Sequence, residues 1–331
     1  MGITPFPNGV SSFGIPLAGP SVPTTYGTIY YVDADNGSDG NNGKSMKRAF
    51  ATVAKAYSMV TTNKDDVIVC STNAAHALTV MLDVTKNRVH FVGLSYGANR
   101  KYGLRSRWTM GNSTTTADIA LLKVTGVGCT FHNIKFDSSS TVAASDYCVA
   151  DGGEYTYFEN CEIYKSTNLD ETGAAELLAN GDSSTYVNCT IGSLVNAISG
   201  AILRPCVLLT REIITGKVAR DVTFSGCNFW RKCGNTGNRF VYGANATDVE
   251  RMLLFDRCLF VNAKLAAAVP AQNVAFGATQ TEGEVLLWDC ASMNAATAMS
   301  TTTGVFALGA DAGADSTTEG AAQMGIAIQC S

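Results

Sequence analysis

A short frame of strand-like residues recurs along this chain, and its recurrence constrains the fold more than any other feature. The frame ends in cysteine five times, in YFENC, TYVNC, TFSGC, LFDRC and LLWDC, at Cys161, Cys189, Cys227, Cys258 and Cys290. An aromatic residue or leucine stands three positions before each cysteine, and Ile or Phe stands two positions after the first four. Alternation at period two is typical of β-strands.

The spacing of this frame indicates a solenoid. The segment FHNIKF at residues 131–136 fits the frame with Ile134 in the cysteine position, so successive spacings are 27, 28, 38, 31 and 32 residues. A sandwich or jelly roll also supplies many short strands, but it does not place one residue type in one frame at such intervals. Stacked coils do, because equivalent residues then lie above one another. We expect GIAIQC, ending at Cys330, to be the last coil, and the repeat weakens where Ser292 replaces Ile or Phe.

A second recurrence, an apolar run closed by glycine, precedes these strands in CVADGG, LLANGD, FVYGAN, VAFGAT and VFALGAD. We therefore expect at least two strands per coil, with the glycines permitting a corner conformation that a Cβ disfavours. The cysteines are expected to be buried ladder residues, since a reactive thiol needs an accessible, electropositive setting. Together the two recurrences predict a parallel β-helix.

Residues 28–60 carry a second motif. TIYYV predicts a strand, residues 33–45 a loop dense in Asp, Asn and Gly, and residues 50–60 a helix with Phe50, Val53, Ala54 and Tyr57 on one face. The loop matches an NGSDxNxG pattern at Asn36, Gly37, Ser38, Asp39, Asn41 and Gly43. This segment resembles the opening of right-handed parallel β-helix proteins of the pectate-lyase-like class, and the resemblance covers residues 28–331. It implies that the helix caps the N-terminal end of the solenoid and that residues 65–70 and 89–94 form the first coil.

The predicted fold is thus all-β: a single-stranded right-handed parallel β-helix of about eight coils over residues 28–331, roughly 35 to 40 Å long. A short capping helix precedes the coils, and residues 1–27 form an extended arm. These 27 residues hold five of the seven prolines, so they cannot be helical. Their apolar side chains suit an arm that docks on a partner, and an arm that folds back on its own β-helix is the alternative; the proposed contacts are Phe6, Val10, Phe13, Ile15 and Leu17.

Charge and hydrophobicity exclude two classes of partner. The 24 Lys and Arg against 28 Asp and Glu give a net charge of -4, so no positive excess is present to bind nucleic acid. No apolar stretch reaches the ~18 residues that span a membrane, and the N-terminus lacks the basic and apolar regions of a secretion signal. The 11 cysteines are odd in number, which favours reduced thiols.

No sequence motif specifies catalysis. P-loop and HExxH patterns are missing, and His76, His90 and His132 do not have zinc-ligand spacing from a cysteine pair. Glycoside cleavage needs paired carboxylates, but the position two before each cysteine holds Glu159, Val187, Ser225, Asp256 and Trp288, with no acids on neighbouring coils. Asn160 above Asn188 predicts a hydrogen-bonded stack rather than a site.

The remaining candidates are weaker. Asp170, Glu171, Asp311, Asp315 and Glu319 lie in loop-like sequence, where acids are usually solvated. Asp33, Asp35 and Asp39 alternate as calcium ligands do, but they lack the EF-hand spacing and its final Glu. We therefore expect no catalytic residue, no metal and no cofactor. Trp230, followed by Arg231 and Lys232, is the best exposed aromatic residue for sugar stacking, and it is equally a surface packing residue.

The resembling class includes polysaccharide lyases and hydrolases, phage tailspikes and structural virion proteins, so the fold alone does not decide function. Our preferred hypothesis is a non-enzymatic bacteriophage protein that decorates or cements the capsid surface after synthesis in the host cytoplasm. The arm would bind the major capsid protein or another virion component, and the protein would be a homotrimer. The alternative is a tailspike or receptor-binding protein with polysaccharide-binding or -cleaving activity. A secreted non-viral lyase is disfavoured by the absent signal and the many cysteines.

Overall fold

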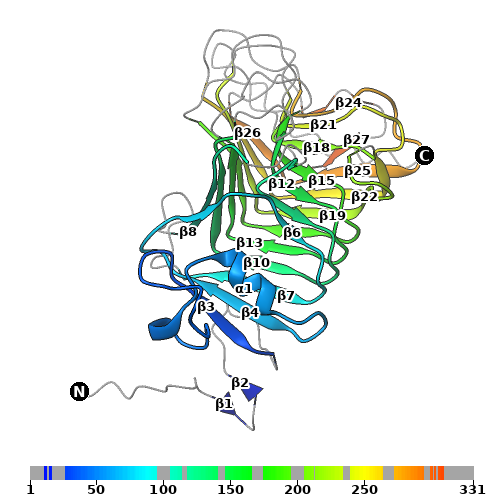
Figure 1. The fold of residues 1–331 in the computed structure, drawn as a ribbon. Helices are drawn as coiled ribbons and strands as arrows, with labels where there is room; N and C mark the ends of the chain where they lie inside the picture. Colours follow the sequence, from blue (N-terminus) through cyan, green and yellow to red (C-terminus); the bar gives the residue numbers. More distant parts are fainter. Residues whose placement is uncertain are drawn as a thin grey trace.

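The chain is a right-handed parallel β-helix (Figure 1), as the repeat and the resemblance predict. The computed structural model describes residues 11–12, 15–16, 27–94, 105–113, 118–140, 146–165, 174–194, 205–211, 213–233, 239–263, 272–293, 299–300, 302 and 305–308. Over these residues three parallel sheets run along the axis, which we call sheets I, II and III, with ten, eight and seven strands. A complete coil therefore contributes three strands, where the sequence indicates at least two.

Sheet I consists of β3 (Ile29–Val32), β4 (Asp66–Cys70), β7 (Val89–Gly93), β10 (Thr130–His132), β13 (Tyr157–Glu159), β16 (Thr185–Val187), β19 (Ala219–Ser225), β22 (Val249–Asp256), β25 (Gly283–Trp288) and β27 (Val305–Leu308). Sheet II consists of β5 (His76–Leu78), β8 (Ser106–Met110), β11 (Ile134–Ser138), β14 (Glu162–Lys165), β17 (Thr190–Gly192), β20 (Asn228–Arg231), β23 (Leu259–Asn262) and β26 (Ala291–Met293). Sheet III consists of β6 (Leu82–Val84), β9 (Leu122–Val124), β12 (Tyr147–Asp151), β15 (Ala175–Ala179), β18 (Val207–Leu209), β21 (Val241–Gly243) and β24 (Val274–Phe276).

One residue in the left-handed conformation makes the corner between sheets I and II on six successive coils. These residues have φ between 49° and 61°, and they are Asn133, Asn160, Asn188, Gly226, Arg257 and Asp289. Each backbone N–H continues the ladder between coils; that of Asn160, for example, donates to the Val187 carbonyl at 3.0 Å. Asn, Asp and Gly adopt this conformation at the lowest cost, which explains the residue type at five of the six corners; Arg257 is the exception. Asn160 and Asn188 accordingly lie on consecutive corners.

An aromatic ladder fills the interior behind sheet I. Six buried rings stack nearly parallel, with neighbouring centroids 4.6 to 5.1 Å apart; they belong to Phe91, Phe131, Phe158, Tyr186, Phe224 and Phe255. Leu287 pairs with Phe255 on the next strand and continues the column. The strand register therefore agrees with the alignment on the cysteine frame.

The five framed cysteines lie immediately after these corners, buried and with free thiols. Each Sγ lies 3.3 to 3.5 Å from a backbone carbonyl of the preceding coil; the residues are Cys161, Cys189, Cys227, Cys258 and Cys290. Elsewhere in the core, burial raises the pKa of the Cys70 and Cys148 thiols to about 12. Protonated, inaccessible thiols are inert as nucleophiles.

The glycines that close the runs of sheet III have a different role from the predicted one. Gly153, Gly181, Gly243 and Gly277 are not among the residues with positive φ, so their corners need no left-handed conformation. They are required by close approach instead: a Cβ on Gly277 would lie 2.6 Å from the Ala244 carbonyl oxygen, and one on Gly181 would overlap Ser184 Oγ. The expectation of a special glycine conformation was therefore wrong.

Two strand assignments also differ from the expectation. The run VFALGAD was grouped with the glycine-closed runs, but β27 pairs with β25 in sheet I. Strand β18 belongs to sheet III and was not identified, because no glycine closes its VLL run.

The predicted final strand, at residues 325–330, lies outside the described residues. Ser292 on β26 remains buried at the weakened repeat, where it accepts a hydrogen bond from Asn273 at 3.0 Å.

The capping helix is α1 (Val53–Met59), preceded by the short 3₁₀ helix η1 (Met46–Arg48). Thr52 caps it by accepting from the Lys55 N–H at 3.1 Å, and Phe50 lies before it as an extended residue that pairs with Val32. Since the helix begins only at Val53, its buried face consists of Val53 and Ala56, with Tyr57 packed beside them. Ala54 is exposed, which corrects the predicted face. The helix covers β3, β4 and β5 at the N-terminal end (Figure 1).

Two short strands lie within the predicted arm. Strands β1 (Ser11–Ser12) and β2 (Ile15–Pro16) pair with each other in antiparallel fashion. The other residues before Gly27, and all the side chains proposed as partner contacts, lie outside the described residues, so the arm and its partner remain predictions. Across the part of the chain that is described, none of the helices has the length and hydrophobicity to cross a membrane.

The buried cysteines generate a labelling prediction. In the folded protein at pH 8, iodoacetamide should leave the ten described thiols unmodified, because burial excludes the reagent. After unfolding in guanidinium chloride all ten should react, as counted by peptide mass spectrometry. Rapid native-state labelling of Cys189 or Cys227 would contradict the packing of the cysteine column.

Candidate functional site

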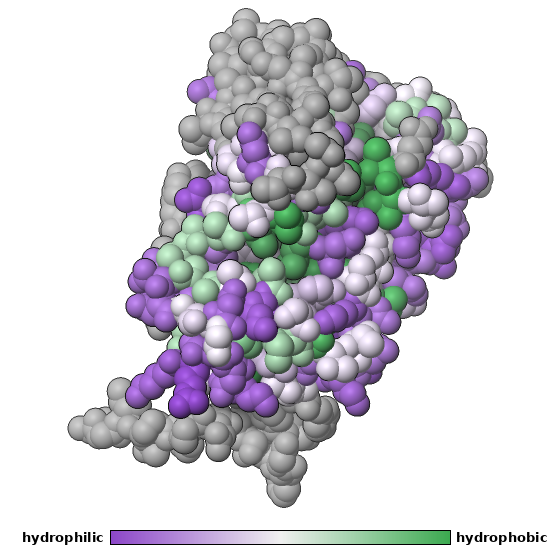
Figure 2. Space-filling model, in the orientation of Figure 1, coloured by the Kyte–Doolittle hydropathy of each residue, from purple (hydrophilic) through white to green (hydrophobic). Residues whose placement is uncertain are grey.

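The outer face of sheet III is mostly apolar. Hydrophobic residues gather over its strands (Figure 2), and Ala150, Leu178 and Leu208 are buried there together with Ile214. A cavity of about 380 Å³ lies at its edge, lined by Met81, Ile119, Lys123, Ile213, Ile214 and Thr215. Its charged member Lys123 is paired with Asp83 at 3.3 Å. This face offers packing surface but few groups for chemistry.

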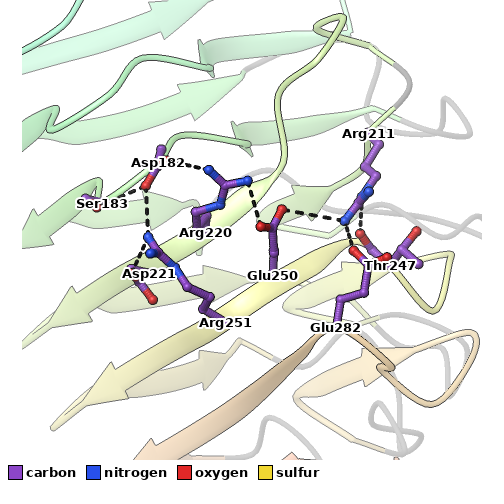
Figure 3. Close-up of polar contacts among 9 residues, drawn as sticks. All are labelled: Asp182, Ser183, Arg211, Arg220, Asp221, Thr247, Glu250, Arg251 and Glu282. Atoms are coloured by element: carbon purple, nitrogen blue, oxygen red, sulfur yellow. Dashed lines mark hydrogen bonds and ion pairs between the residues drawn. The ribbon is translucent and has the colours of Figure 1, made fainter.

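Ionic side chains form a network where β19 and β22 begin, at the turn from sheet III to sheet I (Figure 3). Arg220 lies between Asp182 at 2.9 Å and Glu250 at 2.6 Å. Arg251 contacts Asp221 at 2.5 Å and Asp182 at 3.5 Å, and Arg211 bridges Glu250 and Glu282. Every carboxylate in Figure 3 faces a guanidinium group. We therefore interpret the network as a set of ion pairs that stabilise the packing of neighbouring coils, and not as a reactive centre.

This network predicts a pH dependence of stability. The hydrogen bond from Arg220 holds the pKa of Glu250 below its ordinary value of 4.5. Because the pKa of Glu250 is lower in the folded protein than in the unfolded chain, its ionisation stabilises the fold at pH values above the unfolded-state pKa. This stabilisation is lost as the pH falls through the folded-state pKa. The melting temperature of Glu250→Gln should therefore lie below wild type above about pH 4.5.

The difference between Glu250→Gln and wild type should shrink towards pH 3 and in high salt, since the pair is partly exposed to solvent. Glu284→Gln, at an exposed position on β25, is the matched control and should follow wild type throughout. Melting curves that differ by the same amount at pH 3 and pH 7 would rule out the ion pair as the cause.

The outer face of sheet II carries the most varied chemistry. Two columns of outward side chains run along it, and the register places Arg107, Lys135, Glu162, Thr190, Asn228 and Leu259 in one. The second column contains Thr109, Asp137, Tyr164, Gly192, Trp230, Val261 and Met293. The face therefore changes from charged on the N-terminal coils to aromatic and apolar on the C-terminal coils.

The charged part consists of paired side chains. Arg107 Nη2 lies 2.6 Å from Asp137 Oδ2, and Glu162 contacts Lys135 Nζ at 2.8 Å and Arg105 Nη1 at 3.4 Å. Asp137 and Glu162 come from neighbouring strands with an offset of two residues, which separates their Cα atoms by about 8 Å. Three cations thus surround two carboxylates on adjacent coils, an arrangement that could bind and polarise an anionic ligand.

The apolar part is hollowed into a groove. Its volume is about 300 Å³, and it is lined by Thr190, Leu194, Asn228, Trp230, Leu259, Val261 and Met293. Trp230 is half-buried, so its position is held by packing while the indole still reaches the groove. Hydroxyl and amide groups at Thr190 and Asn228 supply hydrogen bonds beside these apolar side chains. Such a mixture is typical of small-molecule and sugar sites.

The residue after Trp230 does not lie on this surface. Strand alternation turns Arg231 into the interior, where its guanidinium pairs with Glu176 of β15 at 2.9 Å and both side chains are almost fully buried. Arg231 is therefore not part of the surface around Trp230. The ion pair instead connects sheet II to sheet III directly behind the groove. Lys232 is half-buried.

The other predicted candidates are dispersed. In sheet I, Val187 and Ser225 separate Glu159 from Asp256, as the sequence frame indicates. Asp33 accepts from the Asp35 and Asn36 N–H groups, and Asp39 accepts from the Ala51 and Thr52 N–H groups, so both carboxylates organise the opening loop. The remaining acidic candidates lie outside the described residues; they are Asp170, Glu171, Asp311, Asp315 and Glu319.

The sequence search missed the carboxylates of sheet II because it compared only positions before each cysteine, which lie on sheet I and at the corner that follows it. Asp137 and Glu162 lie in different columns, so no position in the cysteine frame holds both. The segments KFD and CEIY nevertheless alternate apolar and polar residues at the period of a strand. This alternation predicts that Asp137 and Glu162 point outward.

Comparison with known proteins supports the fold. No protein-family model matches the sequence, and no curated protein matches it either. Among solved structures, a pectin methylesterase from Aspergillus niger is similar over 87% of this chain and 85% of its own, with a TM-score of 0.54 and 13% identity. A rhamnogalacturonan lyase is similar over 80% of this chain and 68% of its own, at a TM-score of 0.52 and 14% identity. Pectate lyase Pel9A is similar over 86% of this chain and 78% of its own, with a TM-score of 0.50 and 14% identity.

These neighbours contradict the expectation of a protein without enzymatic activity, because they are enzymes. At such low identity the likeness shows the shared fold, so an activity of this chain has to be argued from its own residues. The virion location, the capsid partner and the trimer are not tested by these findings, and they remain predictions.

Proposed function

We propose that this protein is a polysaccharide-active enzyme whose glycan lies along the outer face of sheet II. The observation that carries the proposal is the continuous surface from the ion-paired carboxylates Asp137 and Glu162 to the groove beside Trp230. The parallel strands extend this surface over successive coils, which suits a linear chain of sugar units. Its shared fold with polysaccharide-active enzymes adds an analogy.

The groove would hold sugar rings in a defined orientation. The apolar face of a sugar packs on the Trp230 indole, and its hydroxyl groups exchange hydrogen bonds with Asn228 and Thr190. Closer to the N-terminal end, Arg105, Arg107 and Lys135 outnumber Asp137 and Glu162 by one charge, which favours a glycan that carries carboxylates.

The charged end would carry the chemistry. A carboxylate that abstracts a proton next to a sugar carboxyl group needs cations to stabilise the developing negative charge. Glu162 between Arg105 and Lys135 has this environment, so we assign it as the base and Arg107 and Lys135 as charge stabilisers. Hydrolysis by two carboxylates is the competing reaction, and it would need one of them protonated.

Binding is tested with Trp230→Ala against a panel of acidic and neutral polysaccharides. Affinity should fall about 10- to 100-fold, as for other central tryptophan contacts, in affinity electrophoresis or calorimetry. Trp230→Phe should retain part of the affinity. Trp288→Ala is the matched control, because Trp288 is exposed on sheet I and should not contribute. Equal losses in both alanine variants would place the glycan elsewhere.

Cleavage is tested with Glu162→Gln on any polysaccharide that binds. The rate should fall about 10²- to 10⁴-fold while affinity changes little, because an uncharged amide cannot accept the proton. A lyase product contains a new double bond that absorbs in the ultraviolet, whereas a hydrolase product gains only a reducing end. Full activity in Glu162→Gln would remove the base assignment, and binding without cleavage in wild type would leave a glycan-binding protein.

A further inference from the structure

The groove on sheet II has more apolar surface than an unsubstituted sugar can use. Of the seven described residues that line it, five are apolar, and they are Leu194, Trp230, Leu259, Val261 and Met293. A sugar ring stacks on one aromatic side chain, but it carries hydroxyl groups around its rim. A hydroxyl group that is buried against aliphatic side chains without a hydrogen bond is unfavourable. The aliphatic part of the groove therefore suits a sugar that carries an apolar substituent.

The strand register separates the polar end of the groove from its apolar end. Thr190 of β17 and Asn228 of β20 are consecutive residues in one outward column. On the next two coils, β23 and β26 line the groove with Leu259, Val261 and Met293. The apolar end is open to solvent, because Met293 is 57% exposed. A substituent can therefore enter this end while the ring stays at the polar end.

The polar end contains side chains that await a partner. Thr190 is only 3% exposed and lines the groove, yet none of the described residues forms a hydrogen bond with its hydroxyl group. The amide of half-buried Asn228 likewise has no hydrogen-bond partner within the described part of the chain. Buried polar groups without a partner are rare in folded proteins. At the wall of a groove, they are typical of a site whose ligand supplies the partner.

We propose that the groove binds an acetylated sugar unit, an inference that rests on the proposed glycan face. The sugar ring stacks on Trp230, and a ring hydroxyl group pairs with Thr190. The acetyl methyl group packs at the apolar end against Val261 and Met293. Asn228 lies between the two ends, and its amide N–H donates a hydrogen bond to the acetyl carbonyl oxygen.

An acetyl group matches this end of the groove better than a hydroxyl group does. It combines one apolar methyl group with one carbonyl acceptor, and it has no O–H that would need an acceptor among aliphatic side chains. Acetyl esters and acetamides share this chemistry, so both kinds of sugar belong to the proposed ligand class.

The groove would select the polysaccharide rather than react with it. Strand β14, which carries Glu162, lies two strands from β20 in sheet II, a separation of about 10 Å along the axis. The acetylated unit in the groove is therefore a different unit from the one next to Glu162. Its contacts determine which glycan binds, while the charged end determines what happens to it.

The test is saturation-transfer NMR of the full chain with four probes: methyl glucoside, its 6-O-acetyl ester, methyl N-acetylglucosaminide and methyl fucoside. An acetylated probe should bind about 10-fold more tightly than methyl glucoside, since methyl burial and one hydrogen bond both contribute. Saturation should be strongest on the acetyl protons. The comparison of ester with acetamide identifies the linkage, and methyl fucoside, which has an apolar methyl group without a carbonyl, should bind more weakly than the better acetylated probe.

Val261→Thr keeps the shape of the side chain and adds a hydroxyl group to the apolar end. It should remove most of the preference for the acetylated probe and leave the affinity for methyl glucoside unchanged. Val80→Thr is the matched control, because Val80 is an exposed valine outside the groove, and it should keep the full preference.

Two results would overturn the inference in different ways. Equal affinity for acetylated and plain probes, with both affinities lost in Trp230→Ala, would refute the acetyl assignment and keep the glycan face. Probe binding that is unchanged in Trp230→Ala would place the sugar elsewhere, and it would overturn the glycan face together with the acetyl assignment.

Discussion

The single left-handed residue between sheets I and II sets the register on which this molecule depends. A corner of one residue fixes the length of the connection, so on six successive coils, from β11 to β26, the strand of sheet II starts in phase with the coil before it. Residues of one kind therefore stack along the axis, as the rings from Phe91 to Phe255 do inside. The same register aligns the outward side chains into columns, and these columns are where function can be built.

The outer faces use this alignment in different ways. Sheet III buries apolar side chains, while the start of sheet I at β19 and β22 alternates acids and arginines so that ion pairs connect coils. Sheet II directs charged and aromatic side chains outward. Behind its groove, Arg231 and Glu176 are buried as a pair that costs desolvation, and replacing either alone would leave an uncompensated charge. We suggest that this pair fixes the strand that presents Trp230.

Much of the fold could be predicted from sequence because the corner after sheet I has constant length. The cysteine frame therefore reports the register directly, whereas loops of variable length precede and follow the strands of sheet III, and β18 carried no marker. The helix face was misjudged at Ala54 because the true start at Val53 depends on the Thr52 cap and on Phe50 pairing with Val32.

The sites were harder to predict than the fold. Asp137 and Glu162 become neighbours only when two outward columns of sheet II are compared, whereas the search for paired acids followed positions before the cysteines, which lie on sheet I. A hydrogen-bonded cluster around Thr130 likewise joins Asp65, His90, His132 and Glu159 across coils that precede most of the cysteines. No sequence spacing marks such an arrangement, because stacking of the coils rather than sequence distance brings the residues together.

The most direct test of the central claim, that sheet II is the glycan face, uses the three tryptophans as reporters. Fluorine-labelled tryptophan gives one NMR signal each for Trp108 in the core, Trp230 in the groove and Trp288 on sheet I. Addition of a bound oligosaccharide should shift the Trp230 signal and leave the other two in place. A shift of Trp288 with an unchanged Trp230 signal would contradict the account.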